Sequence, residues 1–341
     1  MRILLRPRLP VLALLLFAPT IPELLTGSTP ITTLFVDPVQ FLVSFGIDIG
    51  LYGTGALLIR EFVVYYRKGW ASTLLLGAAY GIAEEGFAVH TFFQPGGSPV
   101  GALGSYGHAF GVNWLWALGL TVFHATYSIA LPILLTGLWF PEAKGRRWLD
   151  RGAVGLTAAI YLLVVFAFAL LVGHGPTPAE FGFFLAVVAL LIVLAFRAPA
   201  HLLSARPGPS RLRPLGWVLV GTLSFDAWVL VLLFAGIAQV PAAVPAVLFA
   251  VADLVAIALV VTRAGQDDLV RSEYYFATGM LLVLFVWDGV IELSVPGVLL
   301  VAAVMAYLQY RLGRRLALGA GRPAVAPGPP GGGAAGEGGP P

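Results

Sequence analysis

ASTLLLGAAYGIAEEGFAVHTFF, residues 71–93, decides the fold of this chain. The run is long and apolar enough to cross a bilayer as a helix, which takes about 17 to 25 residues. It nevertheless contains two adjacent acids, Glu84 and Glu85, and a histidine, His90. Ionisable side chains are costly in hydrocarbon, so they face a bundle interior or a water-filled cavity and indicate function. The stretch therefore predicts a transmembrane helix that carries a functional acid pair.

The composition of the whole chain indicates a membrane protein. Of the 341 residues, 59% are hydrophobic and 11% are charged, and the mean hydropathy is +0.90. One soluble core could not hide so many apolar residues. Ten apolar runs of spanning length centre on residues 9–26, 40–64, 71–93, 113–139, 153–173, 180–197, 216–238, 243–262, 273–292 and 296–311. They predict an all-α, polytopic bundle of about ten transmembrane helices in the cell membrane, with the lipid bilayer as its partner.

The basic residues predict the orientation of these helices. Lys and Arg are retained on the cytoplasmic side of short loops. With ten helices and a cytoplasmic N-terminus, all 20 Lys and Arg residues fall at inner ends or in inner loops. A wrong helix count would scatter them onto both faces. We therefore expect both termini to be cytoplasmic, and the pI of about 9.3 reflects this orientation and not binding of nucleic acid.

The chain divides into a helical part and a tail. Residues 1–316 are expected to form the transmembrane domain, and residues 317–341, rich in Pro and Gly, a disordered cytoplasmic tail. The first run also resembles a secretory signal, but Pro19 directly after Ala18 disfavours cleavage there. The chain has no cysteine, which excludes disulfides and thiolate chemistry.

The third helix carries its acids on a face suited to close contact. Gly77 and Gly81 form a GxxxG pair, and helical geometry places Glu84 on the same face with Glu85 one position round. His90 lies well round the helix and nearer the outer end. We expect His90 to be an interfacial residue and not a catalytic one.

The fourth helix presents a polar stripe. Asn113 and His124 are close to three full turns apart, and Thr121 and Ser128 lie one turn before and after the histidine. Pro132 removes a backbone donor and crowds the carbonyl of Ser128, which predicts a kink or an opened carbonyl below the stripe.

Depth brings the two helices together. The third run is directed outward and the fourth inward. At about 1.5 Å per residue, Glu84 and His124 both lie roughly 13 to 17 Å below the outer surface. We therefore expect Glu84, Glu85 and His124 to line one cavity in the outer half of the bundle.

The acid pair and the later histidine resemble the CPBP family of intramembrane glutamate endopeptidases, which includes the CaaX prenyl proteases. The pattern of that family is EExxxR, then FxxxH, then HxxxN or HxxxD. Glu84 and Glu85 match the pair, while Val89 stands at the arginine position. The second motif is LTVFH, with Leu120 in place of phenylalanine and His124 matching. The third motif is absent from the later helices.

The resemblance covers about residues 71–130 and implies a protease that cleaves a membrane-embedded peptide. Two carboxylates side by side, Glu84 and Glu85, should share a proton and titrate as a unit. Their ionised member would activate water as a general base. His124 would assist proton transfer or stabilise the oxyanion, and Asn113 would orient the imidazole.

Other catalytic designs fit the sequence less well. There is no HExxH zinc motif, no GxGD motif of aspartyl intramembrane proteases and no GxSG nucleophile motif. Ligand chemistry leaves open a metal held by Glu84, Glu85 and His124, although we assign no metal and the sequence names no cofactor.

A membrane carrier is a second class of function. Ten helices fit a five-plus-five inverted repeat, in which Asp48 corresponds to Asp226 and Glu84 loosely to Asp253. Paired acids near the middle of the membrane suit proton- or ion-coupled transport.

A non-catalytic scaffold is the third class. Isolated polar residues form interhelical hydrogen bonds worth about 1 kcal/mol each. Seven acids lie within the apolar runs: Glu23, Asp48, Glu84, Glu85, Asp226, Asp253 and Asp288. Taken singly, Asp253 and Asp288 favour the scaffold, whereas the doubled desolvation cost of Glu84 with Glu85 favours function. The sequence fixes neither the substrate nor the oligomeric state.

Overall fold

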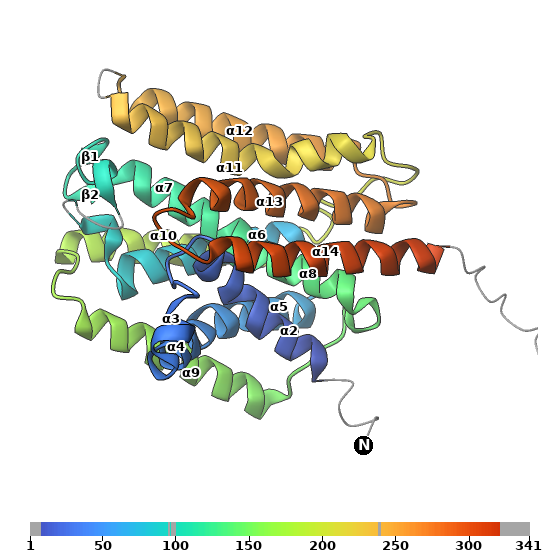
Figure 1. Ribbon diagram of the computed structural model, residues 1–341, viewed down its shortest axis with the longest axis horizontal. Coiled ribbons are helices and arrows are strands. Elements are labelled where there is room, and N and C mark those ends of the chain that lie inside the picture. The colour runs from blue at the N-terminus through green and yellow to red at the C-terminus, as the bar shows by residue number, and fades with distance from the viewer. Residues whose placement is uncertain (1–7, 95, 97–99, 238–239, 321–341) are drawn as a thin grey trace, which may run out of the picture.

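The protein is an all-α membrane bundle (Figure 1). The computed structural model describes residues 8–94, 96, 100–237 and 240–320. Within these residues, ten helical units coincide with the ten apolar runs predicted from the sequence. Seven of the units are long and apolar enough to cross a membrane. Of the other three units, the first is too short. The third contains the two glutamates and the tenth contains arginines, and these charged residues lower the mean hydropathy of both units.

The first four units are interrupted by π-helical turns. They are α2 (Leu9–Pro19) with η1 (Thr20–Leu24); α4 (Pro38–Asp48) with η2 (Ile49–Gly53) and α5 (Thr54–Tyr65); α6 (Trp70–Ile82) with η3 (Ala83–Ala88); and α7 (Trp114–Phe123) with η6 (His124–Ala130) and α8 (Leu131–Trp139). The other six are α9 (Arg151–Leu171), α10 (Pro178–Arg197), α11 (Pro214–Ile237), α12 (Ala243–Arg263), α13 (Leu269–Ile291) and α14 (Val298–Ala320).

Short elements connect these units. They are α3 (Thr33–Val36), the 3-10 turns η4 (Thr91–Phe93), η5 (Gly101–Gly104) and η7 (Pro141–Ala143), and the strands β1 (His108–Ala109) and β2 (Val112–Asn113). The strands pair antiparallel, with His108 opposite Asn113. Phe110 and Gly111 both have positive φ, as the two-residue turn of a tight hairpin requires. This hairpin positions Asn113 at the outer end of α7.

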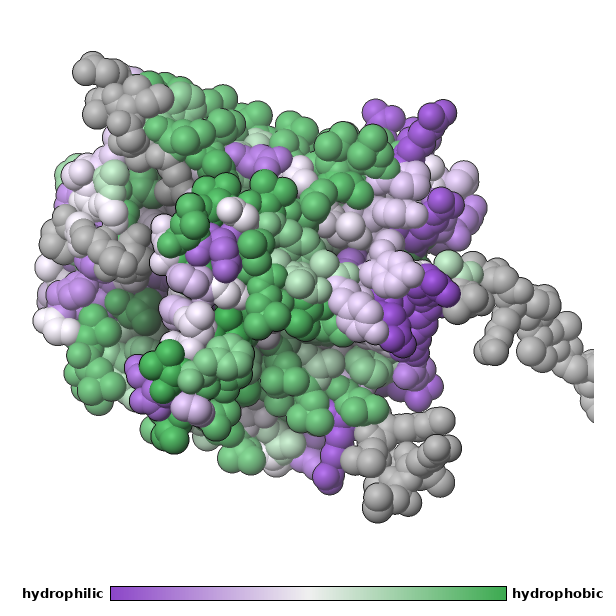
Figure 2. All heavy atoms as spheres, in the orientation of Figure 1, coloured by the Kyte–Doolittle hydropathy of each residue, from purple (hydrophilic) through white to green (hydrophobic). Residues whose placement is uncertain are grey.

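Side-chain contacts confirm that the helices alternate in direction. At one end of the bundle, Lys68 Nζ lies 2.5 Å from the carbonyl oxygen of Phe196, and Lys144 Nζ lies 3.1 Å from a carboxylate oxygen of Glu273. Figure 2 shows hydrophilic side chains gathered at this end, where α14 ends and α2 begins, with an apolar band beside them. The gathered basic residues identify this end as cytoplasmic.

The periphery of the bundle is built for lipid. Helices α9, α10 and α12 expose most of their apolar side chains, as Leu163, Leu170 and Leu254 illustrate. The interior is packed between α8, η6, α13 and α14, where Tyr127 and Leu284 are fully buried.

The first helix lies in the bundle, as expected, whereas the last helix is longer than expected. Leu14, Ala18 and Ile21 are fully buried, so the first helix is an integral part of the bundle. At the other end, α14 continues to Ala320 and includes the first four residues of the predicted tail. The remainder of that tail, residues 321–341, lies outside the described residues.

Candidate functional site

The π-helical turns carry the polar groups of the candidate site. In a π turn the backbone hydrogen bonds join residues i and i+5, which widens the helix. Such turns are rare and occur frequently at functional sites. In the described part of the chain, all four π turns belong to the first four helical units, and η6 packs against both η1 and α6. The polar residues they present are Glu23 on η1, Tyr52 on η2, Glu84 and Glu85 on η3, and His124 and Ser128 on η6. The turn η6 ends two residues before Pro132, and the kink or opened carbonyl expected there stays a prediction.

Small residues allow the third and fourth helices to approach closely. A Cβ atom on Gly77 would lie 2.8 Å from Cα of Ala125, and one on Gly81 would lie 2.9 Å from Cβ of His124. The predicted GxxxG contact is therefore confirmed, and it brings η3 against η6.

Glu85 and His124 form the centre of the site. Nε2 of the imidazole lies 3.0 Å from Oε1 of Glu85. The other carboxylate oxygen of Glu85 accepts a hydrogen bond from the hydroxyl of Thr91, which in turn accepts one from Nε1 of Trp116 at 2.9 Å. Both oxygens of Glu85 are thus engaged. On the far side of the ring, Nδ1 lies 2.9 Å from the hydroxyl of Ser128.

Glu84 has a different environment. Its Oε2 atom lies 3.3 Å from Nδ1 of His124, without the alignment of a hydrogen bond. That oxygen is buried and has no hydrogen-bond partner among the residues that the structure describes. The rings of Tyr52 and Tyr80 lie 6.0 Å and 6.1 Å from the imidazole ring, centroid to centroid. Glu84 and His124 are each 2% exposed, so the site is closed to bulk solvent.

A second acidic pair is linked to this group. The hydroxyl of Tyr52 donates to Glu23 at 2.6 Å. Thr29 lies 3.1 Å from carboxylate oxygens of both Glu23 and Asp48. Because the ring of Tyr52 also stacks on His124, Glu23 and Asp48 belong to the same polar cluster. Asp48 and Thr29 are only partly buried and lie at its outer edge.

The structure does not place Asn113 beside the imidazole. Its amide nitrogen donates to the carbonyl of Gln94 at 2.6 Å, and its amide oxygen lies 2.7 Å from Nδ1 of His108. The expected orienting role falls instead to Ser128 and Glu85, which contact the two ring nitrogens of His124. Three helical turns separate the two residues by roughly 16 Å along the axis, so a shared face does not bring Asn113 to the ring. The helix begins at Trp114, and Asn113 belongs to the hairpin.

His90 is also placed differently from the expectation. It is 6% exposed, and its Nδ1 lies 2.6 Å from the carbonyl oxygen of His174. It is therefore buried beneath the loop between α9 and α10 and does not lie at the lipid interface. With a φ of 59°, His90 also ends the third helix and turns Thr91 toward Glu85.

The remaining acids are dispersed. Asp226 is exposed on α11. Asp253 belongs to α12 and lines a cavity. Asp288 is fully buried on α13, and neither of its carboxyl oxygens has a hydrogen-bond partner among the described residues. The environment of Asp226 does not match that of Asp48. The two halves of the bundle therefore do not present equivalent acids.

The central trio also has the geometry of a metal site. Glu84, Glu85 and His124 each offer one ligand atom, and these atoms lie within 4.8 Å of one another. Carboxylates with an imidazole are a donor set that divalent transition metals accept. The trio can thus act as acid–base groups or as ligands.

Comparison with known proteins gives one match. A family model described as an uncharacterized membrane protein family matches residues 12–327. No curated protein matches the chain, and no solved structure does. No model of the CPBP family matches, so the resemblance drawn from the motifs is not confirmed.

Proposed function

We propose that the chain, which belongs to the uncharacterized membrane protein family matched over residues 12–327, is an intramembrane hydrolase that cleaves membrane-embedded peptides. One observation carries the proposal. Glu84 presents a buried carboxylate oxygen without a hydrogen-bond partner among the described residues, 3.3 Å from the imidazole of His124. Glu85 is occupied on both oxygens. We therefore assign the general base to Glu84 and the positioning of the imidazole to Glu85.

The proposed reaction uses these groups in sequence. Glu84 accepts a proton from water as the water oxygen bonds to the carbonyl carbon of the substrate. Protonated His124, held by Glu85 and Ser128, stabilises the negative charge on the carbonyl oxygen. Glu84 then returns the proton to the leaving nitrogen as the carbon–nitrogen bond breaks.

Val89 replaces the arginine of the CPBP pattern, and a protonated His124 would supply the positive charge instead. In that pattern the arginine is a charge partner for a carboxylate of the pair. Here, Nδ1 and Nε2 of His124 lie 3.3 Å and 3.0 Å from oxygens of Glu84 and Glu85. An imidazolium can therefore act as the counter-charge of both carboxylates.

The unpartnered carboxylate oxygen of Glu84 also argues against a purely structural role. A buried carboxylate oxygen that no hydrogen bond reaches, as Oε2 of Glu84 is among the described residues, costs free energy, and a scaffold gains nothing from it. Glu84 and Glu85 also lie on π turns, which interrupt the regular helical hydrogen bonding. Such costs are typical of functional sites, where the surrounding structure maintains them.

A labelling experiment tests the proposal. The purified protein in lipid nanodiscs is incubated with a pool of single-span membrane peptides in water enriched in oxygen-18. We expect cleavage products whose new terminal carboxyl group contains the label, and none with Glu84→Gln. Glu142→Gln, at an exposed position of η7, is the matched control and should cleave as the wild type does. Unlabelled products, or no products from the wild type across the pool, would count against a hydrolase.

A further inference from the structure

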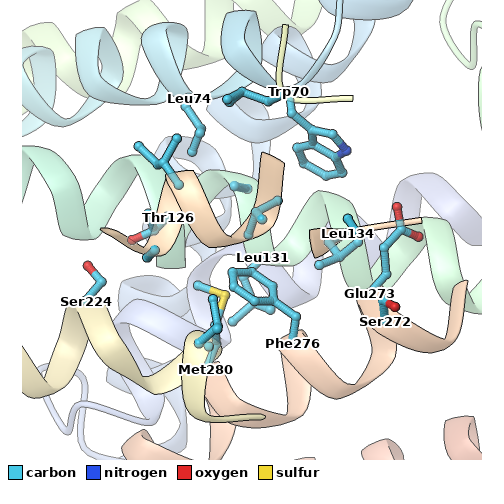
Figure 3. Close-up of a pocket in the computed structure, with 18 of the residues that line it drawn as sticks. Trp70, Leu74, Thr126, Leu131, Leu134, Ser224, Ser272, Glu273, Phe276 and Met280 are labelled. Atoms are coloured by element: carbon cyan, nitrogen blue, oxygen red, sulfur yellow. The ribbon is translucent and has the colours of Figure 1, made fainter. Parts of the chain in front are cut away.

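A cavity lies behind the Glu–Glu–His group, on the other side of η6. Its volume is about 620 Å³, and it separates α6 and η6 from α11, α12 and α13 (Figure 3). Ala125 and Thr126 line it, whereas the preceding residue, His124, is directed to Glu85. Small-molecule pockets have volumes of about 300–1,000 Å³. The cavity is therefore large enough for a drug-sized ligand and distinct from the proposed catalytic group.

The cavity is elongated along the bundle. On α13 its lining extends from Leu269 to Met280, which at about 1.5 Å per residue covers roughly 16 Å. Figure 3 shows Glu273 at one end and Ser224 with Thr126 at the other. The Glu273 end is the cytoplasmic one, because α13 begins there. The cavity thus reaches from the inner surface toward the middle of the bundle.

Its walls are apolar and include aromatic rings. Trp70, Trp217 and Phe276 are among the lining residues, with Leu131 and Leu134 opposite. The side chains of Trp70 and Phe276 point into the space in Figure 3. Such walls favour an apolar ligand, and the faces of aromatic rings attract cations.

The lining of the cavity contains more negative than positive side chains. Three charged residues face the cavity, Lys144, Glu273 and Asp253. Lys144 and Glu273 pair with each other at 3.1 Å at the inner end. Asp253 lies deeper, with the hydroxyl of Ser224 as its partner. Burial disfavours the ionised form of an acid at this depth unless a cation accompanies it, and none of the cavity's own charged residues is left to supply one.

We propose that this cavity binds a lipophilic organic cation, with the positive charge beside Asp253 and the apolar groups against the aromatic walls. The proposal is independent of the hydrolase assignment, because it involves none of the catalytic groups. The ligand class follows from charge complementarity in a site of low dielectric constant, where a buried pair interacts strongly.

Two probes of equal shape and opposite charge test the ligand class. Tetraphenylphosphonium is a cation and tetraphenylborate is an anion of nearly the same size. Binding of each radiolabelled probe, in separate samples, is measured on the protein in lipid nanodiscs, with empty nanodiscs subtracted. We expect saturable binding of the cation and none of the anion. Equal binding of both probes, or no saturable binding of the cation, would overturn the proposal.

Variants of Asp253 test the site. Asp253→Asn should weaken binding of the cation at least about tenfold, since it removes the counter-charge. Asp253→Glu keeps the charge and should bind as the wild type does. Asp226→Asn, an exposed aspartate on the neighbouring helix α11, is the matched control and should change nothing. Wild-type affinity in Asp253→Asn, or an equal loss in Asp253→Glu, would contradict the assignment, and a thermal melt of each variant confirms the fold.

Discussion

Nε2 of His124 lies 3.0 Å from Oε1 of Glu85, although 39 positions separate the two residues in the chain. The contact depends on a close approach of the third and fourth helices, which Gly77 and Gly81 permit. It also leaves Oε2 of Glu84, the proposed base, buried and without a hydrogen-bond partner among the described residues. The proposed division of roles between the two adjacent glutamates follows from the hydrogen bonds that occupy both oxygens of Glu85 and leave Oε2 of Glu84 without one.

The contact between η3 and η6 predicts the effect of Gly81→Ala. The added methyl group would lie 2.9 Å from Cβ of His124, so the helices must separate. We expect a loss of about 1–3 kcal/mol in the free energy of unfolding, the usual cost of overpacking. Thermal unfolding in nanodiscs measures it. Gly155→Ala is the control, since nothing lies within 4 Å of a Cβ there. Equal stability of Gly81→Ala and the control would contradict the close packing.

A buried ion pair at the inner end predicts a second effect on stability. Arg60 pairs with Glu61, which also accepts hydrogen bonds from the backbone of Trp148 at 3.0 Å and Leu149 at 3.4 Å. Glu61→Gln leaves the buried guanidinium without its counter-charge and should cost about 3–5 kcal/mol of unfolding free energy. The same melt checks it, with Glu142→Gln as the exposed control. A melting temperature equal to that of the control would show that the pair contributes nothing.

The alternation of the helices predicts the sides on which two loops lie. Because the chain has no cysteine, single cysteines report their position without interference. Ser105→Cys, exposed in an outer loop, should react with a membrane-impermeant maleimide on intact cells. Ser204→Cys, exposed in an inner loop, should react only after permeabilisation. Labelling of both from the same side would refute the topology.

The trio of possible ligands predicts the response to chelators. The proposed reaction uses Glu84 as a base without a metal, so we expect a chelator to leave the rate unchanged. If Glu84, Glu85 and His124 hold a metal, the chelator should abolish hydrolysis and zinc should restore it. Metal analysis of the purified protein in parallel distinguishes a tightly held ion from an absent one.

Much of the fold follows from elementary patterns in the sequence. Apolar length predicts the ten helical units, and the one-sided distribution of Lys and Arg predicts their alternation. Helical phase and depth also bring Glu84, Glu85 and His124 together, as the structure confirms. These features depend on regular helical geometry and on the cost of burying charge. Both can be inferred from the order of the residues in one sequence.

Other parts of the site depend on local irregularity. The π turns shift the helical phase within η2, η3 and η6, and no pattern of apolar residues indicates them. Thr91 reaches Glu85 only because His90 adopts a positive φ. Glu23 and Asp48 both stand out as acids within apolar runs, but their pairing through Thr29 depends on the folded bundle and has no spacing signal in the sequence. Asn113 does not orient His124, because three helical turns separate the two residues by roughly 16 Å along the axis, and its amide instead contacts His108 and Gln94.

The rate of peptide hydrolysis by Glu84→Gln, relative to Glu142→Gln in the same nanodiscs, tests the central claim most directly. Glutamine keeps the shape of Glu84 but cannot accept the proton of water. We expect a loss of about 100-fold or more, the contribution of a general base, with the thermal melt unchanged and the control at the wild-type rate. Hydrolysis by Glu84→Gln within about threefold of the control would contradict the assignment of Glu84 as the base.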